Sequence, residues 1–416
     1  MDYNREEQQQ HQHQHQQIYP KLENGHVVDD KRYLIIIIPG IFGNELYRLD
    51  DKDRKVIVYP PSYIQFVKGK ISNLFNSTPG ASTFEKYILD PKSKLYPGKI
   101  IKSYMGKNVY ESLFTLMHKC GVYSNLNSVV EFTYDWRQPL HIIASQLIEF
   151  IELQMLKIVN KNNEIILFGH SYGGYILRII LETHYSFFKD IEKISKCVFF
   201  STPFFGQHNL YKMYENLHAI EEENCTIYGG GGGGGGDAGY NAGGNGTCKI
   251  YTNTTYNVEY VQQKRDEIIK NFVANSFFTP TQLFQLFSKF KHSILPLIRL
   301  GDLNVANILT TCKVLGIDIN YYNELYKIIS NMATLENKRS NIEYICIYNT
   351  YNQTLNNAHR KYLTDGLILY NSRDLDIMAK CINFKQIREC DNNLSHSEIF
   401  NSRFVLQNLE HFFKTL

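Results

Sequence analysis

The chain has 416 residues, 43% of them hydrophobic, which is enough to bury a large core. Its 44 basic and 41 acidic residues nearly balance, and this balance argues against a nucleic-acid-binding protein. No apolar run reaches about 18 residues, so the sequence predicts no membrane-spanning helix.

The N-terminal segment is polar. Met1–Glu7 lacks the apolar region of a secretory signal peptide, so we expect an intracellular protein, cytoplasmic in location. Residues 8–17 contain only Gln and His, and such a composition cannot bury a core. Residues 1–30 are therefore predicted to be a disordered low-complexity tail, with weak metal binding by its histidines as the alternative.

Apolar runs that end in turns predict the strands of a sheet covered on both faces. In chain order they are Leu34–Ile38, Ser128–Asp135, Glu164–Phe168, Cys197–Pro203, Ile342–Tyr348 and Cys381–Ile387. Helical patterns lie between several of them, notably at 139–159 and 173–186. This alternation predicts an α/β protein with a doubly wound, mostly parallel sheet and a ligand site at the carboxyl ends of its strands.

Residues 207–335 interrupt the alternation. They include eight consecutive glycines, at 229–236, and several helix-like segments. Because glycine loses more conformational freedom on ordering than any other residue, the tract is predicted to be a flexible loop. We therefore predict a catalytic domain formed by residues 31–206 and 336–416, with 207–335 inserted as a helical cap or lid.

The eight cysteines form no C-x-x-C pair, so no metal or redox motif is present and free buried thiols are expected. Cys225 and Cys248 bracket the glycine tract. Whether these two cysteines form a disulfide stays open, although a reducing cytosol disfavours one.

A candidate nucleophile lies at the end of the third predicted strand. Gly169-His-Ser171-Tyr-Gly173 follows that strand and precedes a helical pattern. The pattern Gly-x-Ser-x-Gly between a strand and a helix is typical of the nucleophile elbow of α/β-hydrolases. Such a turn exposes the serine hydroxyl and places the next backbone N–H, that of Tyr172, near the reacting carbonyl.

The other members of a triad should follow in the order acid, then histidine. Asp365 comes after the Ile342–Tyr348 strand and is the predicted acid, with Asp374 as the alternative. A turn residue is the simpler interpretation of Asp365 alone, since Asp-Gly is a common turn pair. His396 lies in a polar loop after the last predicted strand and before a terminal helix at 404–413, as the base would.

These residue types have complementary roles in acyl transfer. His396 would take the proton of Ser171 and return it to the leaving group. The acid would fix the imidazole tautomer and stabilise its cationic form. Two N–H donors would stabilise the anionic oxygen of the intermediate. One is that of Tyr172, and the other should come from the loop Pro39–Gly43 after the first strand.

Several segments resemble the lecithin:cholesterol acyltransferase family, which includes phospholipid:diacylglycerol acyltransferases and bacterial hydrolase-like members. The similar segments are Pro39–Leu46, Tyr134–Arg137, Gly169–Gly173 and Thr202–Pro203 with Gly206. Val58–Ser62 and Val109–Leu113 look like segments of the bacterial-type members. The resemblance spans about 33–206 and 342–412, and implies Ile41 as the second oxyanion donor. Asp135 and Arg137 are expected to form a structural ion pair, because buried charges usually persist by pairing.

The sequence thus predicts an α/β-hydrolase that transfers the acyl group of a lipid ester to water or an alcohol through acyl-Ser171, without a metal or organic cofactor. A non-lipid carboxylesterase or thioesterase on the same triad, and an inactive lipid-binding protein, are the alternatives. An apolar stripe at Leu283–Ile294, flanked by basic residues, would let the cap contact a membrane surface, or would pack as ordinary core.

Overall fold

The computed structural model describes residues 32–62, 84–123, 128–157, 163–183, 191–204, 247–249, 255–257, 320, 323, 342–349, 351–353, 362–364, 369–370, 384–389 and 396–416. The predicted tail, the glycine tract and the apolar stripe at 283–294 lie outside these residues. The domain boundaries and the membrane contact of the cap therefore stay predictions.

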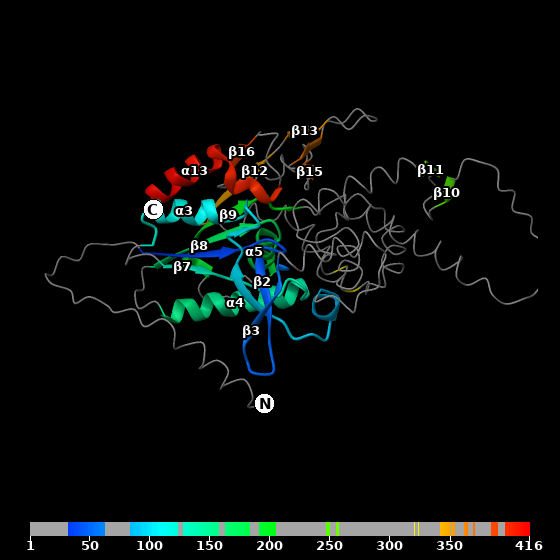
Figure 1. Ribbon diagram of the computed structural model, residues 1–416. Coiled ribbons are helices and arrows are strands. Elements are labelled where there is room, and N and C mark those ends of the chain that lie inside the picture. Colours follow the sequence, from blue (N-terminus) through cyan, green and yellow to red (C-terminus); the bar gives the residue numbers. More distant parts are fainter. Residues whose placement is uncertain are drawn as a thin grey trace, which may run out of the picture. The chain divides into compact units, whose positions relative to one another are not determined.

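Six strands form the central sheet, in the order β16-β12-β9-β8-β1-β7 with every neighbouring pair parallel (Figure 1). Their bounds are β1 (Arg32–Ile38), β7 (Ser128–Glu131), β8 (Asn163–His170), β9 (Ile194–Phe200), β12 (Glu343–Asn349) and β16 (Phe384–Glu389). This order places β1 and β8, which carry the predicted loop and nucleophile, side by side in the sheet. The α/β prediction is confirmed.

Helices cover both faces of this sheet. They are α3 (Glu111–Lys119), α4 (Leu140–Lys157), α5 (Tyr172–Thr183) and α13 (Arg403–Lys414). In Figure 1, α3 and α13 lie together above the strands and α4 lies below them. Helix α5 packs against β8 and α4. A sheet covered on both faces needs apolar side chains on both, which accounts for the uninterrupted run from Leu34 to Ile38.

The core follows the two-residue alternation of the strands. Ile37, Phe168, Val198 and Ile345 are paired in register across β1, β8, β9 and β12, and all four side chains are buried on the face of α3 and α13. The helices contribute Leu113, Phe114, Met117, Val405, Leu409 and Phe413 to the same cluster. Each fully buried aliphatic or aromatic side chain contributes about 1.5–3 kcal/mol relative to an exposed one.

The chain also forms small structures that the sequence did not predict. An antiparallel sheet, β3-β2-β4, follows the loop after β1 and consists of β2 (Asn44–Leu49), β3 (Lys55–Tyr59) and β4 (Tyr96–Ile100). The remaining elements are η2 (Phe84–Ile88), β5 (Ser103–Tyr104), β6 (Lys107–Asn108), η3 (Ile191–Lys193), β10 (Thr247–Lys249), β11 (Thr255–Asn257), β13 (Tyr351–Gln353), β14 (Tyr362–Thr364), β15 (Leu369–Tyr370) and η6 (His396–Asn401).

Two predicted strands end earlier than expected. β9 ends at Phe200 rather than at Pro203, and the difference is larger for β7. The prediction extended the second strand to Asp135, but β7 ends at Glu131. The N–H of Phe132 still donates to the carbonyl of Ile37, at 2.9 Å, whereas the carbonyl of Asp135 accepts from Gln138 in a turn, also at 2.9 Å. The chain therefore leaves the sheet before the segment Tyr134–Arg137.

Two sequence expectations can be compared with the described residues directly. Cys197 and Cys346 are buried free thiols, as expected, whereas Cys120 is free but only half-buried. Across the part of the chain that the structure describes, we find no helix with the length and apolar character needed to cross a membrane.

Candidate active site

Ser171 lies at a sharp turn between β8 and α5. Its φ of +52° falls in the left-handed region, which residues other than glycine rarely adopt. The turn is held on both sides. The N–H of Ser171 donates to the carbonyl of Phe200 at 2.8 Å, and its carbonyl accepts from Tyr175 at 3.2 Å. This is the strand–turn–helix arrangement that the Gly-x-Ser-x-Gly pattern predicts.

Glycines bring the end of β1 against this turn. A Cβ added to Gly173 would overlap the backbone carbonyls of Ile38 and Pro39, so no side chain fits there. On the other side of the contact, a Cβ on Gly40 would lie 3.1 Å from the Cβ of Ser171. The loop that follows β1 therefore lies directly beside the candidate nucleophile.

The structure brings His396 to Ser171 across 225 positions of the chain. The Nε2 of His396 lies 2.8 Å from the Oγ of Ser171, and both residues are buried. His396 begins η6, where Ile399 and Phe400 are buried, and α13 follows directly. The hydroxyl of Ser402 caps α13 by accepting from the N–H of Val405 at 3.0 Å. A base at this distance could take the serine proton without further movement.

The predicted acid is not placed. Asp365 and the alternative Asp374 both lie outside the described residues. The nearest described positions are Thr364, which ends β14, and Leu369, which begins β15. The structure thus brings together the serine and the histidine, and the third member of the triad stays a prediction.

The two predicted oxyanion donors belong to two segments next to Ser171, the start of α5 and the loop after β1. Tyr172 begins α5, so its N–H belongs to the positively polarised end of that helix. Ile41 lies in the loop after β1, where the N–H of Gly43 donates to the carbonyl of Gly40 at 2.9 Å and closes a turn. Phe42, with φ of +64°, completes the reversal into β2. This arrangement is compatible with both donor roles, which stay predictions.

A second histidine lies next to the candidate pair and is held neutral. Two-residue alternation along β8 puts His170 on the same face as Phe168, towards α3 and η6. Its ring stacks on that of His396, with 5.4 Å between centroids. Burial, and secondarily the charge of His396, lower the pKa of His170 to about 3. His170 is therefore not suited to carry a proton during a reaction.

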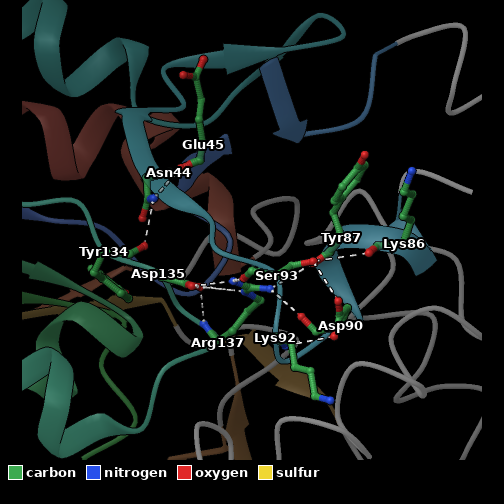
Figure 2. Close-up of polar contacts among 10 residues, drawn as sticks. All are labelled: Asn44, Glu45, Lys86, Tyr87, Asp90, Lys92, Ser93, Tyr134, Asp135 and Arg137. Atoms are coloured by element: carbon green, nitrogen blue, oxygen red, sulfur yellow. Dashed lines mark hydrogen bonds and ion pairs between the residues drawn. The ribbon is translucent and has the colours of Figure 1, made fainter. Parts of the chain in front are cut away.

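The segment Tyr134–Arg137 packs against the loop after β1. The ring of Trp136 lies edge-on to that of Phe42, with 4.8 Å between centroids, and to that of Tyr59, with 5.3 Å. Asn44 donates from Nδ2 to the carbonyl of Tyr134 at 3.1 Å (Figure 2). These contacts hold the segment Tyr134–Arg137 against the loop after β1.

Arg137 and Asp135 form the expected ion pair, and both are buried. The guanidinium donates from Nε to Oδ1 at 2.9 Å and from Nη2 to Oδ2 at 2.8 Å. Arg137 also donates to the backbone carbonyls of Tyr87, Asp90 and Ser93, at 3.0, 3.3 and 3.0 Å (Figure 2). The pair therefore fixes the segment that runs from η2 to β4.

Replacing Arg137 with Met is expected to lower the free energy of unfolding by about 3–5 kcal/mol, because it leaves a buried carboxylate unpaired. Denaturant unfolding monitored by circular dichroism measures the change. Lys119→Met is the matched control, since the Lys119–Glu410 pair is exposed and should contribute about 0–1 kcal/mol. Equal effects of the two substitutions would contradict a stabilising role of the Asp135–Arg137 ion pair.

Among the described residues, no group of three or more His, Cys, Asp or Glu side chains is arranged to hold a metal ion.

Parts of the chain are also similar to known proteins. Residues 92–216 match the family model for lecithin:cholesterol acyltransferase, and this stretch includes the Tyr134–Arg137 segment, Ser171 and Tyr172. Ile41, Asp365 and His396 lie outside the matched residues. No curated protein matches the chain.

Similar solved structures include the Tle4–Tli4 complex, with 12% identity, a TM-score of 0.45 and coverage of 92% of this chain and 98% of that one. A soluble variant of monoglyceride lipase from Saccharomyces cerevisiae has 10% identity, a TM-score of 0.36 and coverage of 94% and 88%. A carboxyl esterase from Bacillus coagulans has 12% identity, a TM-score of 0.32 and coverage of 93% and 90%.

The strand order of the parallel sheet, the strained turn at Ser171 and the match over residues 92–216 agree with one another. The chain is an enzyme of the α/β-hydrolase type that resembles the lecithin:cholesterol acyltransferase family.

Proposed function

We propose that the protein transfers the acyl group of a lipid ester to water or to an alcohol through an acyl-Ser171 intermediate. The observation that carries this proposal is the 2.8 Å contact between the Nε2 of His396 and the Oγ of Ser171, at a turn that forces the serine into the left-handed region. The lipid nature of the ester rests on the family match over residues 92–216.

In the first half of the reaction, the Oγ of Ser171 attacks the ester carbonyl carbon while its proton passes to the Nε2 of His396. The carbonyl oxygen becomes an anion, which the N–H groups of Ile41 and Tyr172 would stabilise. The bond to the leaving alcohol then breaks as His396 returns the proton to that oxygen. The products of this half are the free alcohol and the acyl-serine ester.

In the second half, water or an acceptor alcohol repeats the sequence. His396 takes the proton of the water or alcohol, whose oxygen attacks the acyl carbon. The bond from that carbon to the Oγ of Ser171 then breaks, and His396 returns the proton to the Oγ. The product is a fatty acid when water attacks and a new ester when an alcohol attacks. His170, which is held neutral beside His396, adds no second positive charge to this site.

Two measurements test the proposal. A fluorophosphonate probe should label the protein at Ser171, as identified by mass spectrometry of the modified peptide. The second measurement uses several ester donors that carry the same acyl group but different leaving groups, each at one fixed alcohol concentration. The ratio of new ester to free acid should be the same for all of them, because every donor forms the same acyl-enzyme.

Labelling at another residue, or none, would contradict the nucleophile. A product ratio that changes with the leaving group would contradict the common intermediate. Turnover of short esters or thioesters without turnover of long-chain lipid esters would instead favour the non-lipid esterase.

A further inference from the structure

The peptide that joins Pro39 to Gly40 is held at both of its polar atoms by tyrosine hydroxyls. Its carbonyl oxygen accepts from the Oη of Tyr134 at 2.7 Å. Its N–H, on Gly40, donates to the Oη of Tyr110 at 2.9 Å. All these atoms are buried, and Tyr110 and Tyr134 are each 1% exposed. A peptide plane with both ends bonded has little freedom to rotate.

His170 completes the arrangement. The Oη of Tyr110 lies 2.6 Å from the Nδ1 of His170. Because this hydroxyl accepts from Gly40 and has no other acceptor among the described residues, its own proton goes to Nδ1. That assignment requires the neutral imidazole with its proton on Nε2, and burial keeps His170 neutral by lowering its pKa. The residue beside the nucleophile is thereby connected to the loop after β1.

The held peptide comes directly before the N–H of Ile41. Fixing the plane between Pro39 and Gly40 leaves only the two torsions of Gly40 to set the direction of that N–H. The loop is close-packed here as well, since a Cβ on Gly40 would meet the Nδ1 of His170 at 3.3 Å and a Cβ on Gly43 would meet the Oη of Tyr110 at 2.9 Å. An oxyanion donor needs this kind of fixed direction, because its contribution depends on geometry set before the reaction.

We propose that Tyr110, Tyr134 and His170 are positioning residues that aim the Ile41 N–H at the oxyanion of the acyl-transfer reaction. This inference rests on the proposed function, and it assigns a role to Tyr110, which lies 60 positions from His170 in the chain. None of the three touches the reacting carbonyl in this scheme; they act through the peptide that precedes Ile41.

Tyr110→Phe should test it with little change of shape. We expect the kcat for a short ester to fall by about 10-fold or more with KM nearly unchanged, which is less than the about 100- to 1,000-fold loss on removing an oxyanion donor outright. A trifluoromethyl ketone, which forms an anionic adduct with the serine, should bind more weakly by the same factor. Binding of the carboxylic acid product should not change.

Variants of His170 separate positioning from folding. His170→Asn places an amide oxygen near the position of Nδ1 and should keep kcat within a few-fold of the wild type. His170→Leu removes the acceptor and should lose activity as Tyr110→Phe does. Tyr59→Phe is the matched control, because this buried hydroxyl donates to the carbonyl of Phe42 at 3.2 Å and not to the Pro39–Gly40 peptide.

The inference is overturned if Tyr110→Phe retains wild-type kcat and wild-type affinity for the ketone. It is also overturned if His170→Asn and His170→Leu lose activity equally, or if Tyr59→Phe lowers kcat as much as Tyr110→Phe. Failure of the proposed function looks different: the Ser171→Ala variant would then remain active, whatever the tyrosine variants do.

Discussion

Ser171→Ala is expected to reduce ester hydrolysis by about 10⁶-fold, the scale measured when the nucleophile of a serine hydrolase is removed. The physical reason is that the variant lacks the Oγ that lies 2.8 Å from the Nε2 of His396. The fold should survive, because alanine meets the same left-handed strain at φ of +52° as serine does. Turnover of a short chromogenic ester and the melting temperature measure the two effects.

A second serine on the neighbouring strand supplies the control. Ser201 follows β9 as Ser171 follows β8, has a φ of +45°, and is fully buried. Its Oγ has no hydrogen-bond partner among the described residues. Ser201→Ala should therefore keep wild-type turnover and fluorophosphonate labelling. Retained turnover in a folded Ser171→Ala variant would exclude the covalent mechanism.

The central sheet could be predicted because its signal is local. A strand that is buried on both faces is apolar along its buried length, so runs such as Leu34–Ile38 and Ile165–Phe168 mark the strands without any knowledge of their partners. The elbow is local too. Its left-handed serine and its close backbone contacts require small residues at fixed offsets, and Gly169 and Gly173 supply them.

The elements that surround the site were less accessible to prediction. The strands of the β3-β2-β4 sheet are short, and β2 pairs with both neighbours through register shifts, so no clean alternation marks them. The partners of Arg137 are backbone carbonyls, which any residue type can provide. The ion pair with Asp135 was predicted correctly. The contact of Arg137 with the segment from η2 to β4 could not be predicted from the sequence.

Tyr110 illustrates the limit most clearly. The sequence singled out Val109–Leu113 only for its resemblance to bacterial family members, and gave Tyr110 no role. Its significance comes from two hydrogen bonds, to Gly40 and to His170, that cross 70 and 60 positions. A long-range contact between a common residue type and a backbone N–H produces no periodicity or spacing, so it cannot be predicted from a single sequence.

The acid of the triad is ambiguous for a related reason. Chain order allows both Asp365 and Asp374. β14 and β15 pair antiparallel, with Thr364 opposite Leu369, and the sequence connecting them includes Asp365-Gly366. Asp-Gly is a preferred pair in such connections, which would explain Asp365 without any catalytic role. Asp374 comes after β15 and is not part of an Asp-Gly pair, so turn preference does not explain it. No predicted strand or turn directly precedes Asp374 to favour it as the acid.

Asp365→Asn is expected to lower kcat by about 10⁴-fold, the loss seen when the triad aspartate of a serine protease becomes asparagine and the histidine adopts the wrong tautomer. His396→Ala sets the reference, because removing the base should cost about as much as removing Ser171. Asp374→Asn is the matched control and should stay within a few-fold of the wild type. If Asp374→Asn is instead the damaging substitution and Asp365→Asn is mild, the carboxylate that orients His396 comes from beyond β15, and the acid was misassigned to Asp365. Asn keeps the size and much of the turn preference of Asp at both positions, so a selective loss of kcat with an unchanged melting temperature identifies the orienting carboxylate rather than a broken turn.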